Sequence, residues 1–130
     1  MISGGKIVAK VLIVDDANFM QITLEKVLQL GSHQVVGKAN NGIEAIQLYK
    51  ETKPEIVLLD ITMPEMDGIE TISEIMKMDP EAKVIMCSAM GQQKIVVKAI
   101  ELGAKDFIVK PFDESKVLET VDRVLNNIDS

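Results

Sequence analysis

The stretch LLDITMPEMDG (residues 58–68) joins the end of an apolar run to a turn rich in proline, aspartate and glycine. Residues 56–59 are continuously apolar rather than alternating, which is typical of a strand covered on both faces in a parallel sheet. The run ends in a carboxylate, Asp60, and the turn chemistry of Pro64 and Gly68 is expected to shape the loop that follows. The stretch therefore predicts a buried strand whose last residue lies at the carboxyl end of the sheet rather than in its interior.

Four further short apolar runs resemble this one, at residues 11–14, 35–36, 84–87 and 107–109. Between the runs, apolar residues recur at the helical spacing of three and four positions. The expected helix ends and caps are Gly31, Pro54, Pro80, Gly103 and Asp113. Alternating strands and helices with short connections predict parallel strands joined by right-handed crossovers, in one α/β domain of five strands and five helices.

Length and composition limit the possible classes of function. The chain has 130 residues, 47% of them hydrophobic, and such a domain can bury roughly two-thirds of its unfolded surface. The net charge of −6 argues against a nucleic-acid surface, which needs clustered Lys and Arg. No run approaches the ~18 apolar residues of a membrane span, and no signal peptide is expected. With a single cysteine, Cys87, these features predict a cytoplasmic protein that binds neither nucleic acid nor membrane.

Polar or ionisable side chains follow four of the five runs. Asp15 and Asp16 follow the first, Asp60 the third, Ser88 the fourth and Lys110 the fifth. In an open parallel sheet the carboxyl ends of the strands share one edge, and ligands bind there. A single acid after a strand is usually a turn former or a helix cap, but five such groups at matching positions are hard to attribute to capping. The sequence therefore predicts that these side chains converge on one site.

The chemistry of this cluster indicates a cation. Two like charges about 4 Å apart repel by about 4 kcal/mol at an effective dielectric of 20, so three close carboxylates retain a proton unless a cation lies among them. The available ligands are hard oxygens, without thiolate or histidine, which favours Mg²⁺. Mg²⁺ usually completes its shell with water and phosphate oxygens, and Lys110 offers a second positive charge to an incoming anion.

At this point the chain resembles the receiver domains of bacterial two-component response regulators, most closely the single-domain chemotaxis regulators. The segments that carry the resemblance are VLIVDDANFM (11–20), LLDITMPEMDG (58–68), CSAMGQQ (87–93) and GAKDFIVKPF (103–112). It implies a receiver domain over residues 8–128 after a short N-terminal extension (1–7). It also implies a flavodoxin-like, doubly wound five-stranded parallel sheet with strand order 2-1-3-4-5.

The resemblance implies that Asp60 is the phosphoacceptor, which attacks phosphohistidine on a sensor histidine kinase to give an acyl phosphate. In the family's arrangement, Asp16, Asp60 and the backbone carbonyl of Thr62 hold Mg²⁺, and Asp15 reaches the ion through water. Such a transfer depends mainly on in-line positioning and charge neutralisation. The protein is then expected to promote both its own phosphorylation and its own dephosphorylation, the latter slowly, and not to act as an enzyme.

Further roles follow from the same resemblance. Ser88 would donate to one phosphoryl oxygen and Lys110 would pair with another, and the bond before Pro111 would be cis. On phosphorylation Ser88 would move toward the phosphoryl group and Phe107 would follow it inward. Burial of an exposed Phe stabilises by about 1.5–3 kcal/mol, enough to bias a two-state equilibrium.

The resemblance places signal output on the fourth helix, fifth strand and fifth helix. The residues expected on this output surface are Gln92, Gln93, Val96, Ile100 and Phe107. The expected partner there is a flagellar motor switch protein or, as the alternative, the output of a different two-component pathway, with a phosphatase as a further partner. The protein itself is expected to be a monomer.

Other features set limits on this interpretation. Gln21 replaces a basic residue common in such regulators, and Thr62 and Met90 are expected to flank the phosphoryl group and tune the access of water. His33, the only histidine, lies in a Gly-Ser-His turn and is expected to be solvated, so a histidine phosphodonor must come from a partner.

Three alternatives stay open. A haloacid dehalogenase-type phosphatase also phosphorylates an aspartate but needs a second acid where this chain has Thr62. A flavin or nucleotide module needs a glycine-rich loop where residues 15–18 read DDAN. A receiver that binds partners without phosphorylation would lack key residues, and none is missing here.

Overall fold

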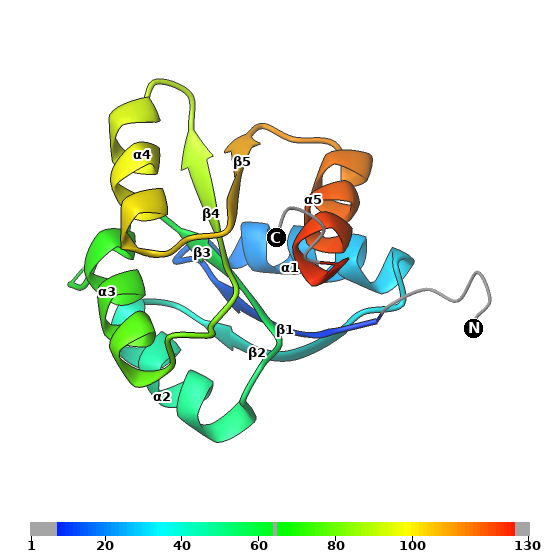
Figure 1. Ribbon diagram of the computed structural model, residues 1–130. Helices are drawn as coiled ribbons and strands as arrows, with labels where there is room; N and C mark the ends of the chain where they lie inside the picture. The colour runs from blue at the N-terminus through cyan, green and yellow to red at the C-terminus, as the bar shows by residue number, and fades with distance from the viewer. Residues whose placement is uncertain (1–7, 64, 127–130) are drawn as a thin grey trace.

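The computed structural model describes residues 8–63 and 65–126 (Figure 1). The elements, in chain order, are β1 (Lys10–Val14), α1 (Asn18–Leu30), β2 (Gln34–Ala39), α2 (Gly42–Thr52), β3 (Ile56–Asp60), α3 (Gly68–Met78), β4 (Val84–Ala89), α4 (Gln93–Leu102), β5 (Asp106–Lys110) and α5 (Glu114–Asn126). The expected extension over residues 1–7, Pro64 and the last two residues of the expected domain (127–128) lie outside the described residues.

The five strands form one parallel sheet in the order β2-β1-β3-β4-β5, which confirms the predicted topology. Helices α2, α3 and α4 cover one face of the sheet, and α1 and α5 cover the other (Figure 1). Because the connections between strands reverse direction between β1 and β3, the carboxyl ends of these two strands form a crevice at the edge of the sheet.

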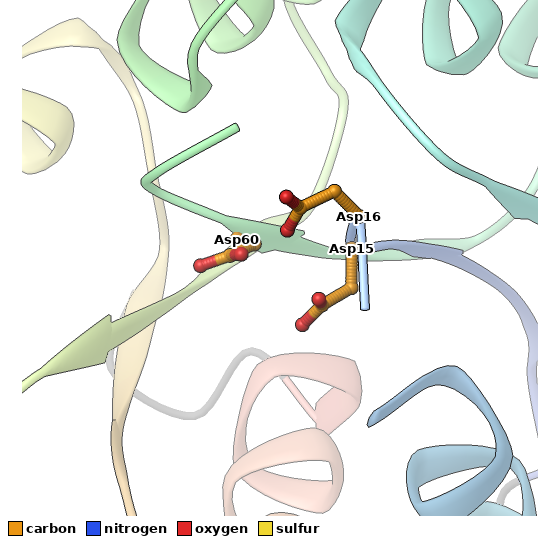
Figure 2. A group of neighbouring side chains, drawn as sticks. All are labelled: Asp15, Asp16 and Asp60. Carbon is orange, nitrogen blue, oxygen red and sulfur yellow. The ribbon is translucent and has the colours of Figure 1, made fainter. Parts of the chain in front are cut away.

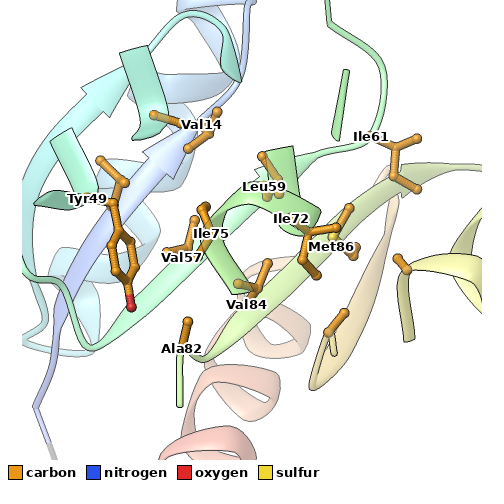
Figure 3. Close-up of a cluster of buried hydrophobic side chains, with 14 of the residues drawn as sticks. Val14, Tyr49, Val57, Leu59, Ile61, Ile72, Ile75, Ala82, Val84 and Met86 are labelled. Atoms are coloured by element: carbon orange, nitrogen blue, oxygen red, sulfur yellow. The ribbon is translucent and has the colours of Figure 1, made fainter. Parts of the chain in front are cut away.

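Side chains of the central strands alternate between the two helical layers. In β3, Val57 and Leu59 pack with the α2–α4 layer (Figure 3), whereas Ile56 and Leu58 pack with the α1–α5 layer. All four are fully buried. A strand covered on both faces needs apolar residues at every position, which explains the continuous run in the sequence.

The two outermost strands are less covered. In β5 only Ile108 is buried, while Phe107 and Val109 are 41% and 38% exposed. The strand β2 is longer than the run at residues 35–36 predicts, because Gly37 and Lys38 interrupt its apolar pattern without ending its pairing with β1.

The helix ends follow the expected chemistry. Gly31 and Gly103 are the C-caps of α1 and α4, and Asp113 accepts a hydrogen bond (2.9 Å) from the Lys116 N–H in the first turn of α5. At the start of α3, Asp67 and Glu70 form a reciprocal capping box. Among the described residues, every helix is too short or too polar to cross a membrane.

The prediction for His33 is wrong. Its side chain is buried, its Nδ1 accepts a hydrogen bond (3.0 Å) from the Ala9 N–H, and its Nε2 lies 3.9 Å from a carboxylate oxygen of Asp122 on α5. The residues before and after it are typical of a turn, but the buried ring lies between Ala9, which precedes β1, and Asp122 of α5.

Candidate functional site

Three carboxylates meet at the carboxyl edge of the sheet. Asp15 and Asp16 directly follow β1, and Asp60 is the last residue of the neighbouring strand β3 (Figure 2). One carboxylate oxygen from each residue lies within 4.8 Å of the others. Asp15 is buried, Asp60 is nearly so, and Asp16 is exposed. Residues 44 positions apart in the chain, Asp16 and Asp60, thus converge as the strand pattern predicts.

The backbone that carries Asp15 is fixed by hydrogen bonds to β2 and α1. The Asp15 N–H donates to the Ala39 carbonyl (3.0 Å), and the Asp15 carbonyl accepts from the Gln21 carboxamide (2.7 Å). Gln21 is buried and also donates to the Asn40 side chain (2.9 Å). Gln21, which stands where such regulators often have a basic residue, therefore connects the residues that follow β1 and β2 through the hydrogen bonds of its buried side chain.

The loop after Asp60 turns back closely against the strand it leaves. The Gly68 N–H donates to the Ile61 carbonyl (2.8 Å). A Cβ atom on Gly68 would lie 2.5 Å from the Asp60 carbonyl oxygen and 2.7 Å from the Ile61 Cα, so only glycine fits. Because of this close approach, α3 begins immediately beside Asp60, the candidate phosphoacceptor.

Lys110, the last residue of β5, extends into the same cluster. Its Nζ lies 3.0 Å from Asp15 Oδ2 and 3.5 Å from Asp60 Oδ1. The peptide bond between Lys110 and Pro111 is cis. Burial acts to lower the pKa of Lys110, but the hydrogen bond to Asp15 and the charges of Asp60 and Asp15 outweigh it, so its pKa is raised and the ammonium stays charged.

The pKa of Asp60 is also raised above its ordinary value. Burial is the largest cause; Lys110 acts against it, and the charge of Asp15 adds to it. Separately from this shift, three carboxylates lie beside one lysine, so the site holds more negative charge than Lys110 neutralises, which a further cation would relieve.

Ser88 lies beside Asp60 because the β3–β4 register pairs Asp60 with Cys87. Its side chain is buried, and its hydroxyl makes no hydrogen bond to the residues that the structure describes. Cys87 itself is fully buried, and burial raises its thiol pKa to about 12, so it stays neutral. Ser88 therefore keeps a donor available at the edge of the acid cluster.

Thr62 and Gln92 form a contact that the sequence pattern does not indicate. The Gln92 carboxamide donates to Thr62 Oγ1 (3.1 Å) and accepts from the Ala89 N–H (2.6 Å). Gln92 stands directly before α4, in a non-helical backbone conformation. No periodicity or motif marks such a bridge, since it depends on how two loops lie side by side.

The five residues of the expected output surface lie together. Gln92, Gln93, Val96, Ile100 and Phe107 all line one mainly apolar groove of about 510 Å³, which also reaches Ser88. Val96 is buried and forms part of the floor, whereas Ile100 and Phe107 are 42% and 41% exposed. The groove thus runs from Ser88, which lies beside Asp60, to the half-exposed ring of Phe107.

Comparison with known proteins agrees with this geometry. Residues 11–122 match the family model of the response regulator receiver domain. The chemotaxis protein CheY of Thermotoga maritima is 58% identical over 115 residues, covering 88% of this chain and 96% of that protein. CheY of Bacillus subtilis is 52% identical over 117 residues, covering 90% of this chain and 98% of that protein.

A solved structure has the same architecture. In the crystal structure of the CheX–CheY–BeF₃–Mg²⁺ complex from Borrelia burgdorferi, the matching chain is 44% identical, with a TM-score of 0.86. The alignment covers 89% of this chain and 88% of that one. From its fold, its converging acids and its likeness to these proteins, the chain belongs to the family of response regulator receiver domains and is highly similar to the CheY chemotaxis proteins.

Proposed function

We propose that this protein is a phosphorylation-activated regulator of chemotaxis in which Asp60 accepts a phosphoryl group from a sensor histidine kinase. The observation that carries the proposal is the convergence of Asp15, Asp16 and Asp60 within 4.8 Å, with Lys110 at 3.5 Å from Asp60. An Asp60 carboxylate oxygen attacks phosphorus, the P–N bond of the kinase's phosphohistidine breaks, and its electron pair returns to the imidazole.

The residues at the site fit Mg²⁺. The carboxylate oxygens of Asp15, Asp16 and Asp60 are hard ligands, and three carboxylates beside the single ammonium of Lys110 favour a divalent cation. Asp16, Asp60 and the Thr62 backbone carbonyl would hold the ion, and Asp15 would reach it through water. When bound, Mg²⁺ supplies charge neutralisation for the phosphoryl oxygens.

Ser88 and Lys110 stabilise the phosphoryl group from the other side of the cluster. Lys110 keeps its positive charge there, and the Ser88 hydroxyl has no competing partner among the described residues. The charged ammonium and the hydroxyl donor then bind oxygens whose charge grows on transfer.

Output is assigned to the groove that joins Ser88 to Phe107. Its lining is mainly apolar, so it suits an apolar segment of a partner, such as a helix laid into it. A shift of Ser88 toward the phosphoryl group leaves room for the half-exposed Phe107 ring to turn inward, which changes the groove. The partner we propose is the flagellar motor switch; a phosphatase is a second partner, and the protein acts as a cytoplasmic monomer rather than as an enzyme.

Treatment with acetyl phosphate and Mg²⁺, read by intact mass, tests the proposal. One phosphoryl adduct is expected, and it should be absent with a chelator and in Asp60→Asn. An adduct that survives in Asp60→Asn would place the chemistry elsewhere, and steady release of phosphate from an aryl phosphate would indicate a phosphatase.

The switch is tested separately with Phe107→Ala. This variant should take up the phosphoryl group at the unchanged rate but bind the motor switch protein more weakly, because the groove loses its movable ring. Unchanged binding would contradict the assignment of Phe107.

A further inference from the structure

One half-buried side chain, Gln92, joins the loop that follows Asp60 to the loop that follows β4. Gln92 reaches back from the start of α4 to accept a hydrogen bond from the Ala89 N–H (2.6 Å) and to donate one to Thr62 Oγ1 (3.1 Å). Ala89 ends β4, and Thr62 lies two residues beyond Asp60. A single carboxamide therefore connects the segment after β3 to the segment after β4, across the mouth of the acid cluster.

The Ala89 N–H that Gln92 binds is a donor that a phosphoryl group would also attract. Asp60 pairs with Cys87 in the sheet, so Ser88 and Ala89 are the next residues along the same edge. A phosphoryl group brings three acceptor oxygens with a charge of about −1.5 to −2. Charged oxygens accept hydrogen bonds that are roughly twice as strong as those of a neutral carboxamide. A phosphoryl group on Asp60 would thus compete with Gln92 for the Ala89 N–H.

The segment between Ala89 and Gln92 is exposed and loosely surrounded. Met90 is 78% exposed, and Gly91 has a φ of +89° with no atom within 4 Å of the position a Cβ would take. Gln92 itself has a φ of −103° and a ψ of 27°, outside the helix that begins at Gln93. Among the described contacts, the bridge is the only side-chain hydrogen bond that holds residues 89–91 against the β3–α3 loop.

We propose that Gln92 is a positioning residue that holds the end of β4 in the unphosphorylated arrangement, and that its bridge must open before the phosphoryl group is fully bound. The proposal rests on the function assigned to Asp60. It predicts a direction that loss of structure alone does not produce: removal of the bridge strengthens the binding of a phosphoryl-like anion.

The test uses Gln92→Met, which keeps the length of the side chain and removes both hydrogen bonds. Beryllofluoride, a mimic of the phosphoryl group, is titrated with excess Mg²⁺, and the fraction bound is followed from backbone amide resonances. The variant should bind the mimic about fivefold more tightly, because the Ala89 N–H no longer has to give up its hydrogen bond to Gln92 before it binds the mimic. Gln29→Met, the same substitution at an exposed position of α1, is the matched control and should bind as the wild type does.

A double-mutant cycle identifies the bridge itself. Thr62→Val removes the hydroxyl that accepts from Gln92 and keeps the backbone carbonyl. If both substitutions break the same contact, the gain in affinity of the double variant is smaller than the sum of the two single gains. In the Gln92→Met variant the Ala89 amide proton should also move upfield before any mimic is added, because it loses its acceptor.

The outcomes separate this inference from the assignment of Asp60. Wild-type protein that binds beryllofluoride, with Gln92→Met tighter and Gln29→Met unchanged, supports the role of Gln92. Unchanged or weaker binding of beryllofluoride by Gln92→Met overturns the role of Gln92 while the phosphoacceptor assignment stands. An equal gain in affinity in Gln92→Met and in the control Gln29→Met has the same meaning. Wild-type protein that does not bind the mimic overturns both.

Discussion

The charged form of the Asp60 carboxylate is destabilised by its position in the fold. Its side chain is 12% exposed, and its pKa is raised above the ordinary value, first because of burial, with Lys110 opposing and Asp15 adding to the effect. An acid whose pKa is raised on folding binds a proton more readily in the folded state than in the unfolded state. At neutral pH the charged carboxylate therefore lowers the free energy of unfolding.

We expect Asp60→Asn to be more stable than the wild type in the presence of a chelator at pH 7. The gain should be roughly 1 kcal/mol after solvent screening, or about 4 °C in Tm. As the pH falls through the raised pKa of Asp60, the wild-type carboxylate becomes protonated and the difference should shrink. Thermal unfolding between pH 7 and pH 4 measures this, and a difference that grows toward low pH would contradict the sign.

Gly68 is constrained by its neighbours rather than by its own dihedral angles. An added methyl group would overlap the Asp60 carbonyl and the Ile61 backbone. We expect Gly68→Ala to cost about 1–3 kcal/mol, because backbone atoms cannot move aside as a flexible side chain can. It should also weaken Mg²⁺ binding, since Asp60 moves with its carbonyl.

Denaturant unfolding and a Mg²⁺ titration test both parts of this prediction. Gly37→Ala, a glycine in β2 whose nearest atoms are flexible leucine side chains, is the matched control. It should leave Mg²⁺ affinity unchanged, and equal losses of Mg²⁺ affinity in the two variants would remove the local explanation.

At the scale of elements, α5 begins with a cap that depends on pH. The Asp113 carboxylate accepts from the Lys116 N–H and from the Ser115 hydroxyl (2.8 Å), and these hydrogen bonds lower its pKa. A lowered pKa contributes stability that is present above the unfolded pKa and lost as the pH falls through the folded value. The start of α5 should therefore loosen in acid before the sheet does.

Asp113→Ala is expected to lower Tm at pH 7, because the first turn of α5 loses its acceptor. The decrease should be smaller at pH 3, where the wild-type carboxyl is largely protonated. Asp113→Asn keeps an acceptor oxygen, so its Tm should lie between that of the wild type and that of Asp113→Ala, with a weaker dependence on pH. Equal losses at both values of pH would show that charge does not contribute to the cap.

The elements also show what the sequence could and could not predict. The strands β1, β3 and β4 are predictable because burial on both faces requires uninterrupted apolar residues, and the positions of Asp15, Asp60 and Ser88 follow from the strand ends. Parallel strands bring those ends together whatever the loops do. For this reason the acid cluster could be predicted before any geometry was known.

Contacts between loops were not predictable in the same way. His33 looks like a turn residue by sequence, yet the ring is buried because the backbone around Ser32, with a φ of +67°, turns it back toward Ala9. The bridge of Gln92 to Thr62 likewise depends on two loops 30 residues apart. Neither has a periodic signal, since a single side-chain contact leaves no repeat in the sequence.

At the scale of the whole molecule, the acid cluster exists only when the sheet is formed. Asp16 follows β1 and Asp60 ends β3, so the unfolded chain holds no site of comparable affinity. A ligand that binds only the folded state stabilises it by mass action, by about 2.7 kcal/mol at a concentration of 100 times its Kd.

We therefore expect Tm to rise with Mg²⁺ concentration and to return to its starting value when the ion is chelated. Asp16→Asn should lose most of this rise, because it removes an exposed carboxylate of the acid cluster without disturbing the core. A scan of Tm against Mg²⁺, with an equal ionic strength of sodium chloride as the control, measures the effect. A rise of the same size in sodium chloride would attribute it to general screening.

The uneven cover of the sheet also bears on self-association. An uncovered outer strand offers unpaired N–H and C=O groups to another chain, which is the first step of cross-β aggregation. Here β5 is five residues long, and its half-exposed Phe107 and Val109 stand between the charged ends Asp106 and Lys110. Charges at both ends of a short strand disfavour its pairing with the edge strand of another molecule. The face that carries the apolar groove can thus stay exposed in solution without nucleating fibrils.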